Sequence, residues 1–159
     1  MRPRKQMPSG QSGLTLLELI IASGILLILS SAALPVLKFT VVRAKEAELR
    51  RDLREMRDAI DQYKDAADQN LVRVQLGSEG YPPDLESLVK GVDYGSGGAS
   101  QKKRFLRRIP VDPMTGRAEW SLRSIQDDPD ATSWGGNNVF DVHSSSTATA
   151  LDGTKYTDW

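Results

Sequence analysis

The chain has 159 residues, of which 39% are hydrophobic and 26% are charged, with 21 basic and 21 acidic side chains. This length suits one domain, and the even charge balance excludes the broad basic surface of a nucleic-acid-binding protein, so no nucleic-acid partner is expected. The sequence contains no cysteine, which excludes disulfides and thiolate-bound zinc.

The N-terminal region divides into a basic leader and an apolar run. Residues 1–13 carry three basic side chains and no acidic one, and without them 18 basic and 21 acidic residues remain, a net charge of about −3. Residues 14–37 contain one charge, Glu18. As a helix these 24 residues span about 36 Å, enough to cross a bilayer core of roughly 30 Å. The run therefore predicts a membrane-spanning segment.

Two ordinary interpretations compete for this segment. It has the features of a cleaved secretory signal, with an apolar stretch at Leu19–Leu29 and small residues for cleavage at Ser31–Ala33. It also suits a plain single-span anchor. Glu18 argues against both classes, because a carboxylate costs about 2.5–3.5 kcal/mol near the centre of a bilayer and neither class requires one.

A third interpretation accounts for the carboxylate. The string GLTLLE at residues 13–18 resembles the prepilin peptidase site of type IV pilins and type II secretion pseudopilins. The resemblance implies cleavage after Gly13 and methylation of Leu14, which stands where phenylalanine is usual. Glu18 then becomes the fifth mature residue, and Pro35 becomes the twenty-second, where this family commonly has a proline that bends the helix.

The resemblance also implies a role for Glu18. After cleavage, Leu14 carries a free α-amino group that is cationic at neutral pH. An ammonium and a carboxylate are each costly to bury alone and tolerable as a pair. In this family the pair forms between adjacent subunits and sets their axial register. We therefore expect Gly13 and Leu14 to be processing residues, and Glu18 and Pro35 to be assembly residues.

The helix is predicted to continue through residues 38–70, because apolar residues recur there at spacings of three and four. These residues are Leu49, Leu53, Met56, Ile60, Tyr63 and Ala67. The stripe is too short for a coiled coil and predicts packing against a small sheet. Three pairs of opposite charge lie four residues apart and are expected to support the helix locally. They are Glu46–Arg50, Arg54–Asp58 and Arg57–Asp61.

Residues 71–159 are predicted to form a globular head. A short amphipathic helix is expected after Tyr81, with Pro83 in its first turn. Partial alternation predicts strands at 118–125 and 138–143, and glycine and aspartate clusters predict the loops between them. The predicted fold is α+β and pilin-like, with a long N-terminal helix packed on a small antiparallel sheet of two to four strands.

The head also resembles the major (G-type) pseudopilin of type II secretion. The resemblance rests on the Tyr-Pro element at 81–82, the PVDP turn at 110–113 and the closing tryptophan, Trp159. It implies a filament subunit of the bacterial inner membrane, with a cytoplasmic leader and a periplasmic head, that assembles into a pseudopilus driving protein export. The implied partners are further copies of the chain, prepilin peptidase, minor pseudopilins, the inner-membrane assembly platform and the membrane. A type IV pilus subunit for adhesion, motility or DNA uptake stays open as an alternative, as does a membrane-tethered binding module.

Two further chemistries were weighed on residues of the head. Major pseudopilins often bind calcium in the C-terminal loop, where Asp141, Asp152 and Asp158 supply the charge, but turn-forming aspartates explain these residues better. His143 is followed by serines, yet neighbours on a strand alternate faces and no nucleophile elbow is present. We expect an exposed histidine at a strand end, no resident cofactor and no enzyme.

Overall fold

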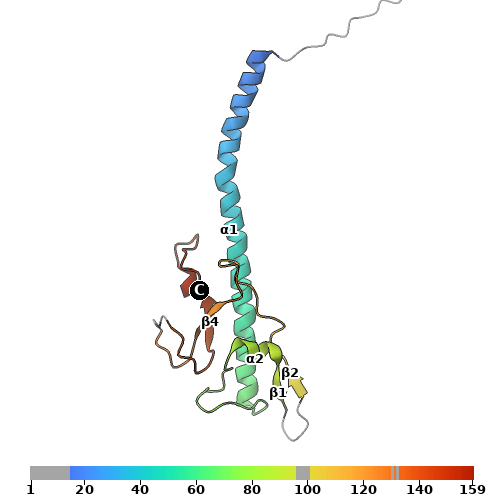
Figure 1. The fold of residues 1–159 in the computed structure, drawn as a ribbon, viewed down its shortest axis with the longest axis vertical. Coiled ribbons are helices and arrows are strands. Elements are labelled where there is room, and N and C mark those ends of the chain that lie inside the picture. Colours follow the sequence, from blue (N-terminus) through green and yellow to red (C-terminus); the bar gives the residue numbers. More distant parts are fainter. Residues whose placement is uncertain (1–14, 96–100, 130, 132) are drawn as a thin grey trace, which may run out of the picture. The chain divides into compact units, whose positions relative to one another are not determined.

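The computed structural model describes residues 15–95, 101–129, 131 and 133–159, with the backbone alone at residues 32–37. The chain divides into two compact units, Met1–Thr40 and Val41–Trp159. Helix α1 (Leu16–Asp68) contributes to both units, and all other regular elements belong to the second (Figure 1).

In the first unit, α1 is apolar on every side. The backbone N–H of Glu18 donates to the hydroxyl of Thr15 at 3.2 Å, so Thr15 acts as the N-cap. Large apolar side chains of the next turns are all exposed: Leu16, Leu17, Leu19, Ile20, Ile21, Ile25, Leu26, Leu27, Ile28 and Leu29. Among the residues that the structure describes, none of the helices is at once long and apolar enough to cross a membrane. The predicted span of residues 14–37 lies partly outside the described residues.

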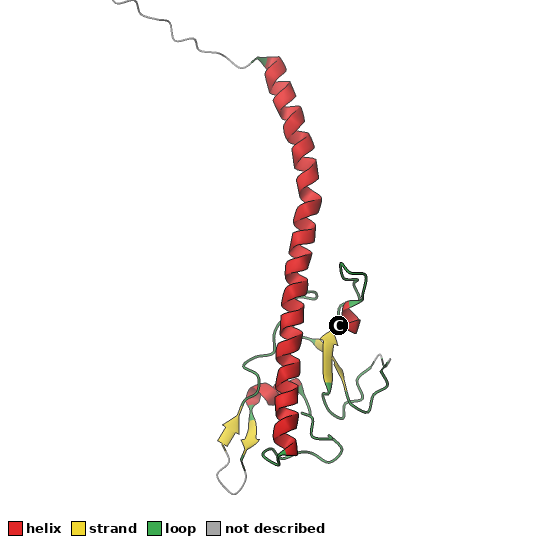
Figure 2. Ribbon diagram, turned by 180° about the vertical axis from the view of Figure 1, so that it is seen from behind, coloured by secondary structure: helices red, strands yellow, loops and turns green. Residues whose placement is uncertain are grey.

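In the second unit, the predicted stripe of α1 is buried, which confirms the helix and its packing face. Its exposed fractions range from 0% at Leu49 to 7% at Ala67. The stripe packs with apolar residues from the rest of the unit, such as Leu88, Val139 and Val142, in one core. Figure 2 shows the two pairs of strands on either side of the helix.

Helix α2 (Leu85–Lys90) forms where the sequence predicts a short helix, but it begins later than expected. Asp84 is the N-cap, since its carboxylate accepts the N–H of Ser87 at 2.7 Å. Pro83 therefore precedes the cap instead of occupying the first turn. The helix ends at Gly91, whose φ of 85° lies in the region that favours glycine.

The described residues contain four strands, which form two separate antiparallel pairs. The predicted α+β class is confirmed, but the single predicted sheet is replaced by two small ones. The predicted strands are confirmed as β3 (Trp120–Arg123) and β4 (Asp141–Ser144), which pair with each other. A second pair, β1 (Val92–Tyr94) with β2 (Gln101–Lys103), was not predicted, because residues 101–108 were interpreted as a solvated basic face.

The PVDP turn at 110–113 is tied to β4 through a buried carboxylate. Asp112 is 0% exposed and accepts two hydrogen bonds of 2.7 Å, from the N–H of Met114 and from the hydroxyl of Ser144. The indole of Trp120 in β3 donates to the carbonyl of Pro110 at 2.9 Å. Because each polar group finds its partner inside the unit, the turn is fixed against the second strand pair.

Candidate functional site

The residues predicted to take part in processing and assembly lie at the start of α1. Gly13 and Leu14 fall outside the described residues. Glu18 is exposed in the first turn, three residues after Thr15. A helix N-terminus carries partial positive charge, so this is a favourable place for a carboxylate. Helix α1 runs through Pro35, so the proline does not end the helix, and the predicted bend stays a prediction.

Thr15 is the N-cap of α1, and sequence reasoning missed it. Thr15 and Glu18 have the spacing of a capping box, in which a threonine hydroxyl accepts the N–H of the third helical residue. The structure contains this hydrogen bond, and the carbonyl of Thr15 also accepts the N–H of Leu19 at 3.1 Å. The Thr-x-x-Glu spacing was visible in the sequence and would have predicted where α1 begins.

An exposed apolar surface follows in the first unit, at residues 16–29 of α1. An amphipathic helix has one apolar stripe, whereas residues 16–29 of α1 present leucine and isoleucine around the full circumference. Exposed apolar area of this extent marks a site of contact with a membrane or with other proteins. The surface is therefore suited to burial among partners of the same chemistry.

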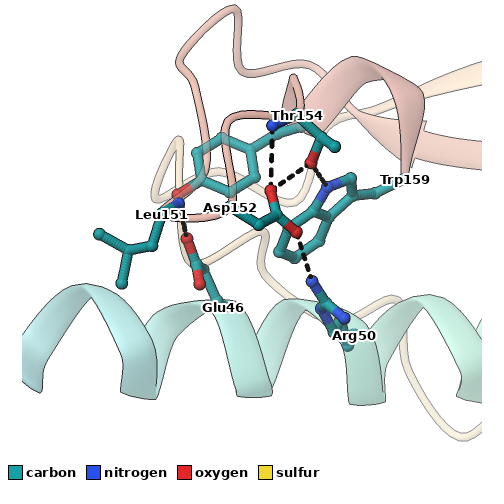
Figure 3. Close-up of polar contacts among 7 residues, drawn as sticks. Glu46, Arg50, Leu151, Asp152, Thr154 and Trp159 are labelled. Carbon is teal, nitrogen blue, oxygen red and sulfur yellow. Dashed lines mark hydrogen bonds and ion pairs between the residues drawn. The ribbon is translucent and has the colours of Figure 1, made fainter.

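A second polar site lies in the second unit, where the C-terminal segment is fastened to α1 (Figure 3). The carboxylate of Glu46 accepts the N–H of Leu151 at 2.8 Å and the hydroxyl of Tyr156 at 3.0 Å. Burial of the Tyr156 ring and its hydrogen bond to Glu46 raise the pKa of this phenol to about 12. One glutamate of the helix thus holds the segment at two points.

One turn further along α1, Arg50 provides a second connection. Its guanidinium pairs with Asp152 at 3.2 Å and lies 4.0 Å from the centre of the Trp159 ring. The other carboxylate oxygen of Asp152 accepts the backbone N–H and the hydroxyl of Thr154, at 3.0 and 2.6 Å. These bonds to Thr154, and then the charge of Arg50, lower the pKa of Asp152.

Arg57 makes the third connection. It donates to Asp141 at 2.7 Å, to the carbonyl of Val142 at 3.0 Å and to the main-chain oxygen of Trp159 at 2.8 Å. Arg57 thereby joins α1, β4 and the C-terminal segment. We call the contacts of Glu46, Arg50 and Arg57 with these residues the C-terminal clamp.

The clamp shows that the local ion pairs predicted along α1 were wrong. Arg50 pairs with Asp152 instead of Glu46, and Arg57 pairs with Asp141 instead of Asp61. An ion pair on an exposed helix surface contributes only about 0.2–0.5 kcal/mol to stability. A carboxylate from another segment, held by a charged hydrogen bond, therefore replaces the partner on the same helix.

The aspartates weighed as calcium ligands are engaged within the chain. Asp152 is occupied by Arg50 and Thr154, and Asp158 accepts the hydroxyl of Thr157 at 3.2 Å. Across the described part of the chain, no group of three or more metal-ligating side chains is close enough together to hold an ion. Calcium takes six to eight oxygen ligands, which include backbone carbonyls as well as carboxylates, and the expectation of no resident cofactor stays a prediction. The bond from the N–H of Thr154 to Asp152 matches the turn-forming role that the sequence favoured.

His143 lies within β4 and is half-buried, not exposed as predicted. Burial, and then the charge of Arg123, lower the pKa of His143. The hydroxyl of Ser144 bonds to Asp112, and that of Ser145 lies 2.9 Å from the hydroxyl of Ser121. The serines beside the histidine are therefore committed to structural hydrogen bonds.

Residues 8–34 match the family described as the prokaryotic N-terminal methylation motif, which is typical of type IV pilins and pseudopilins. The match includes Gly13, Leu14 and Glu18 and ends one residue before Pro35. No curated protein and no solved structure gives a significant match to the chain.

Proposed function

We propose that this chain is the structural subunit of a helical filament, made as a membrane-anchored precursor and processed between Gly13 and Leu14. The observation that carries the proposal is the helix surface from Leu16 to Leu29, which is apolar on all sides and exposed. Such a surface is stable only inside a membrane or among other apolar helices. The methylation motif at residues 8–34 supports the same conclusion.

The two environments follow each other in this proposal. Before assembly, the apolar helix lies in the inner membrane, with the leader in the cytoplasm and the head in the periplasm. After assembly, the same surface lies among the helices of neighbouring subunits. Because lipid and packed leucine side chains are chemically alike, the helix exchanges one for the other without a large loss of solvation free energy. Glu18 then meets the new α-amino group of a neighbour.

Within this class we propose a major pseudopilin of type II secretion. The support is the PVDP turn closed by the buried carboxylate of Asp112, and a C-terminal segment that is held by charged hydrogen bonds without any cysteine. The proposed partners are copies of the chain, prepilin peptidase, minor pseudopilins and the assembly platform of the inner membrane. A type IV pilus subunit has the same N-terminal motif and is the alternative outcome of the genetic test below.

The intact mass of the membrane-extracted protein tests the processing step. A methylated chain that begins at Leu14 supports the proposal. A chain that begins at Leu34, as a secretory peptidase would leave it, overturns it. The matched variant is Gly13→Leu, which removes the small residue before the cut and should leave the leader attached.

Deletion of the gene tests the choice of machine. Loss of protein export with surface pili unchanged supports the pseudopilin assignment. Loss of surface pili with export unchanged overturns that assignment and favours the pilus subunit. Complementation with the Gly13→Leu variant should fail in either case, because an uncleaved precursor has no free α-amino group at Leu14.

A further inference from the structure

One face of α1 in the second unit points away from the core and carries six charged residues, with Ala47 between the first two. The charged residues are spaced seven, four, four, three and four positions apart, which keeps them on one side of a helix. They are Arg43, Arg50, Arg54, Asp58, Asp61 and Asp65, and all six are exposed. We call this surface the outer face. Core residues such as Leu53 and Ile60 lie on the opposite side of the helix.

The charges of the outer face are separated along the helix. The three residues nearer its start are basic, and the three nearer its end are acidic. In the described part of the chain, Arg50 is the member of the face that makes an ion pair, with Asp152. Arg54 and Asp58 are one turn apart but do not pair. Arg54 ends the basic half and Asp58 begins the acidic half. Because neither is in an ion pair within the described chain, both charges are available to another molecule.

A cavity lies beside the basic half. Arg50, Arg54 and Arg57 line a cavity of about 560 Å³ beside the C-terminal segment, and Lys155 completes its basic wall. Asp152 and Asp158 are the acids that line it. Arg50 and Arg57 are already paired with Asp152 and Asp141, so in the described part of the chain Arg54 and Lys155 are the lining cations without an ion pair. An acidic side chain from outside would find complementary charge there.

We propose that the outer face binds a second copy of the chain, with the acidic half of one copy lying against the basic half of the next. The inference rests on the proposed filament and adds the surface that sets the stagger of the heads. The centres of the two halves are about 12 residues apart, which corresponds to a stagger of roughly 18 Å along the helix axis. The contact joins different surfaces of the two copies, so it can repeat from copy to copy, and it builds a filament where the rotation between copies does not close a ring.

Charge reversal tests this contact without disturbing the clamp. The basic-end variant is Arg43→Glu with Arg54→Glu, and the acidic-end variant is Asp58→Lys with Asp61→Lys. Each variant alone should lower the yield of filaments at least tenfold, because like charges then face each other. Combining all four substitutions should restore most of the yield, since the halves are complementary again.

The matched control for the acidic-end variant is Asp93→Lys with Asp128→Lys. It gives the same change of net charge at exposed positions away from the outer face. It should assemble like the parent. If the acidic-end variant also assembles like the parent, the inference is overturned while the proposed filament stands. If the parent, cleaved after Gly13, forms no filaments, both fail together.

Cross-linking tests the direction of the contact. The chain has no cysteine of its own, so Arg54→Cys and Asp65→Cys can be combined in one chain. These positions are about 16 Å apart on the helix, close to the proposed stagger and beyond the roughly 7 Å between Cα atoms that a disulfide can bridge, so a bond must join two copies. Oxidised filaments should give a ladder of multimers. Dimers alone would indicate an antiparallel pair, and intact filaments without cross-links would place the contact elsewhere; either result overturns the inference.

Discussion

Helix α1 contains two regions that use the same backbone for different purposes. Between Leu16 and Leu29 its large side chains are apolar on every side and remain exposed. Beyond Val41 it has one apolar stripe, which is buried, and charged residues elsewhere. The second region completes its packing within the chain, whereas the first requires surroundings that the chain does not supply. The comparison teaches that the second unit and the exposed apolar surface of the first can be altered separately.

The substitution with the largest expected effect is Glu18→Ala. We expect the leader to be cleaved normally and assembly to be lost, because the α-amino group of a neighbouring Leu14 would be buried without a partner. Breaking a buried ion pair costs about 3–5 kcal/mol, which is on the order of a hundredfold or more in an association constant. Intact mass would measure cleavage, and the yield of sheared filaments would measure assembly.

The control is Glu55→Ala, which removes an exposed carboxylate from the second region of the same helix. Its filament yield should match that of the parent. Equal melting temperatures of the Glu18→Ala and parent proteins in detergent would show that the head is untouched. Normal filaments from Glu18→Ala would remove the assigned role of the carboxylate.

The head should instead be sensitive to Asp112→Ala. This change leaves the N–H of Met114 and the hydroxyl of Ser144 without their acceptor in a buried site. We expect the free energy of unfolding to fall by about 2–4 kcal/mol, since each unsatisfied buried group costs about 1–3 kcal/mol. Thermal unfolding followed by tryptophan fluorescence would measure it, with Asp93→Ala as an exposed control. A melting temperature equal to that of the parent would mean that the turn has another support.

The buried stripe of α1 was predictable because helical spacing of apolar residues reports directly on a core. The partners of the clamp were not predictable in the same way. Arg57 and Asp141 are 84 positions apart, and Arg50 and Asp152 are 102 apart, whereas sequence rules for charge pairs reach only one helical turn. The sequence shows that Glu46, Arg50 and Arg57 are charged residues on the helix. Their partners depend on how the rest of the second unit folds against that helix.

The missed pair of strands has a different physical reason. β1 and β2 are three residues each, too short for alternation to be distinguished from chance, and β2 consists of polar residues. Their position is fixed by tertiary contact instead. Tyr94 forms a bridge with Val72, just after α1, and the ammonium of Lys103 lies 4.3 Å from the centre of the Tyr94 ring. Such a pair becomes visible only when the chain is folded.

A smaller effect is expected from pH at the clamp. The pKa of Asp152 is lower in the folded chain than its ordinary value of about 3.8, because Thr154 and Arg50 favour the carboxylate. Its contribution to stability is therefore present above that ordinary value and is lost as pH falls through the lower, folded value. The melting temperatures of parent and Asp152→Asn should differ at pH 7, and the difference should shrink as pH falls below about 3.8. A difference that does not shrink in acid would mean that the asparagine acts through something other than charge.

The smallest effect is expected from removal of divalent ions. The oxygens of Asp152 already accept hydrogen bonds from Arg50 and Thr154. A cation that binds Asp152 would therefore have to displace one of these residues. We expect a chelator to change the melting temperature by less than about 1 °C, because an ion that does not bind the folded state cannot stabilise it. Arg50→Ala should lower the melting temperature in the same buffer, since it removes the pair that holds Asp152 to the helix.

If added calcium raised the melting temperature of the parent in proportion to the logarithm of its concentration, the segment would contain an ion site that the clamp does not exclude. If calcium raised the melting temperature of Arg50→Ala but not that of the parent, the ion would hold Asp152 in place when the arginine is absent.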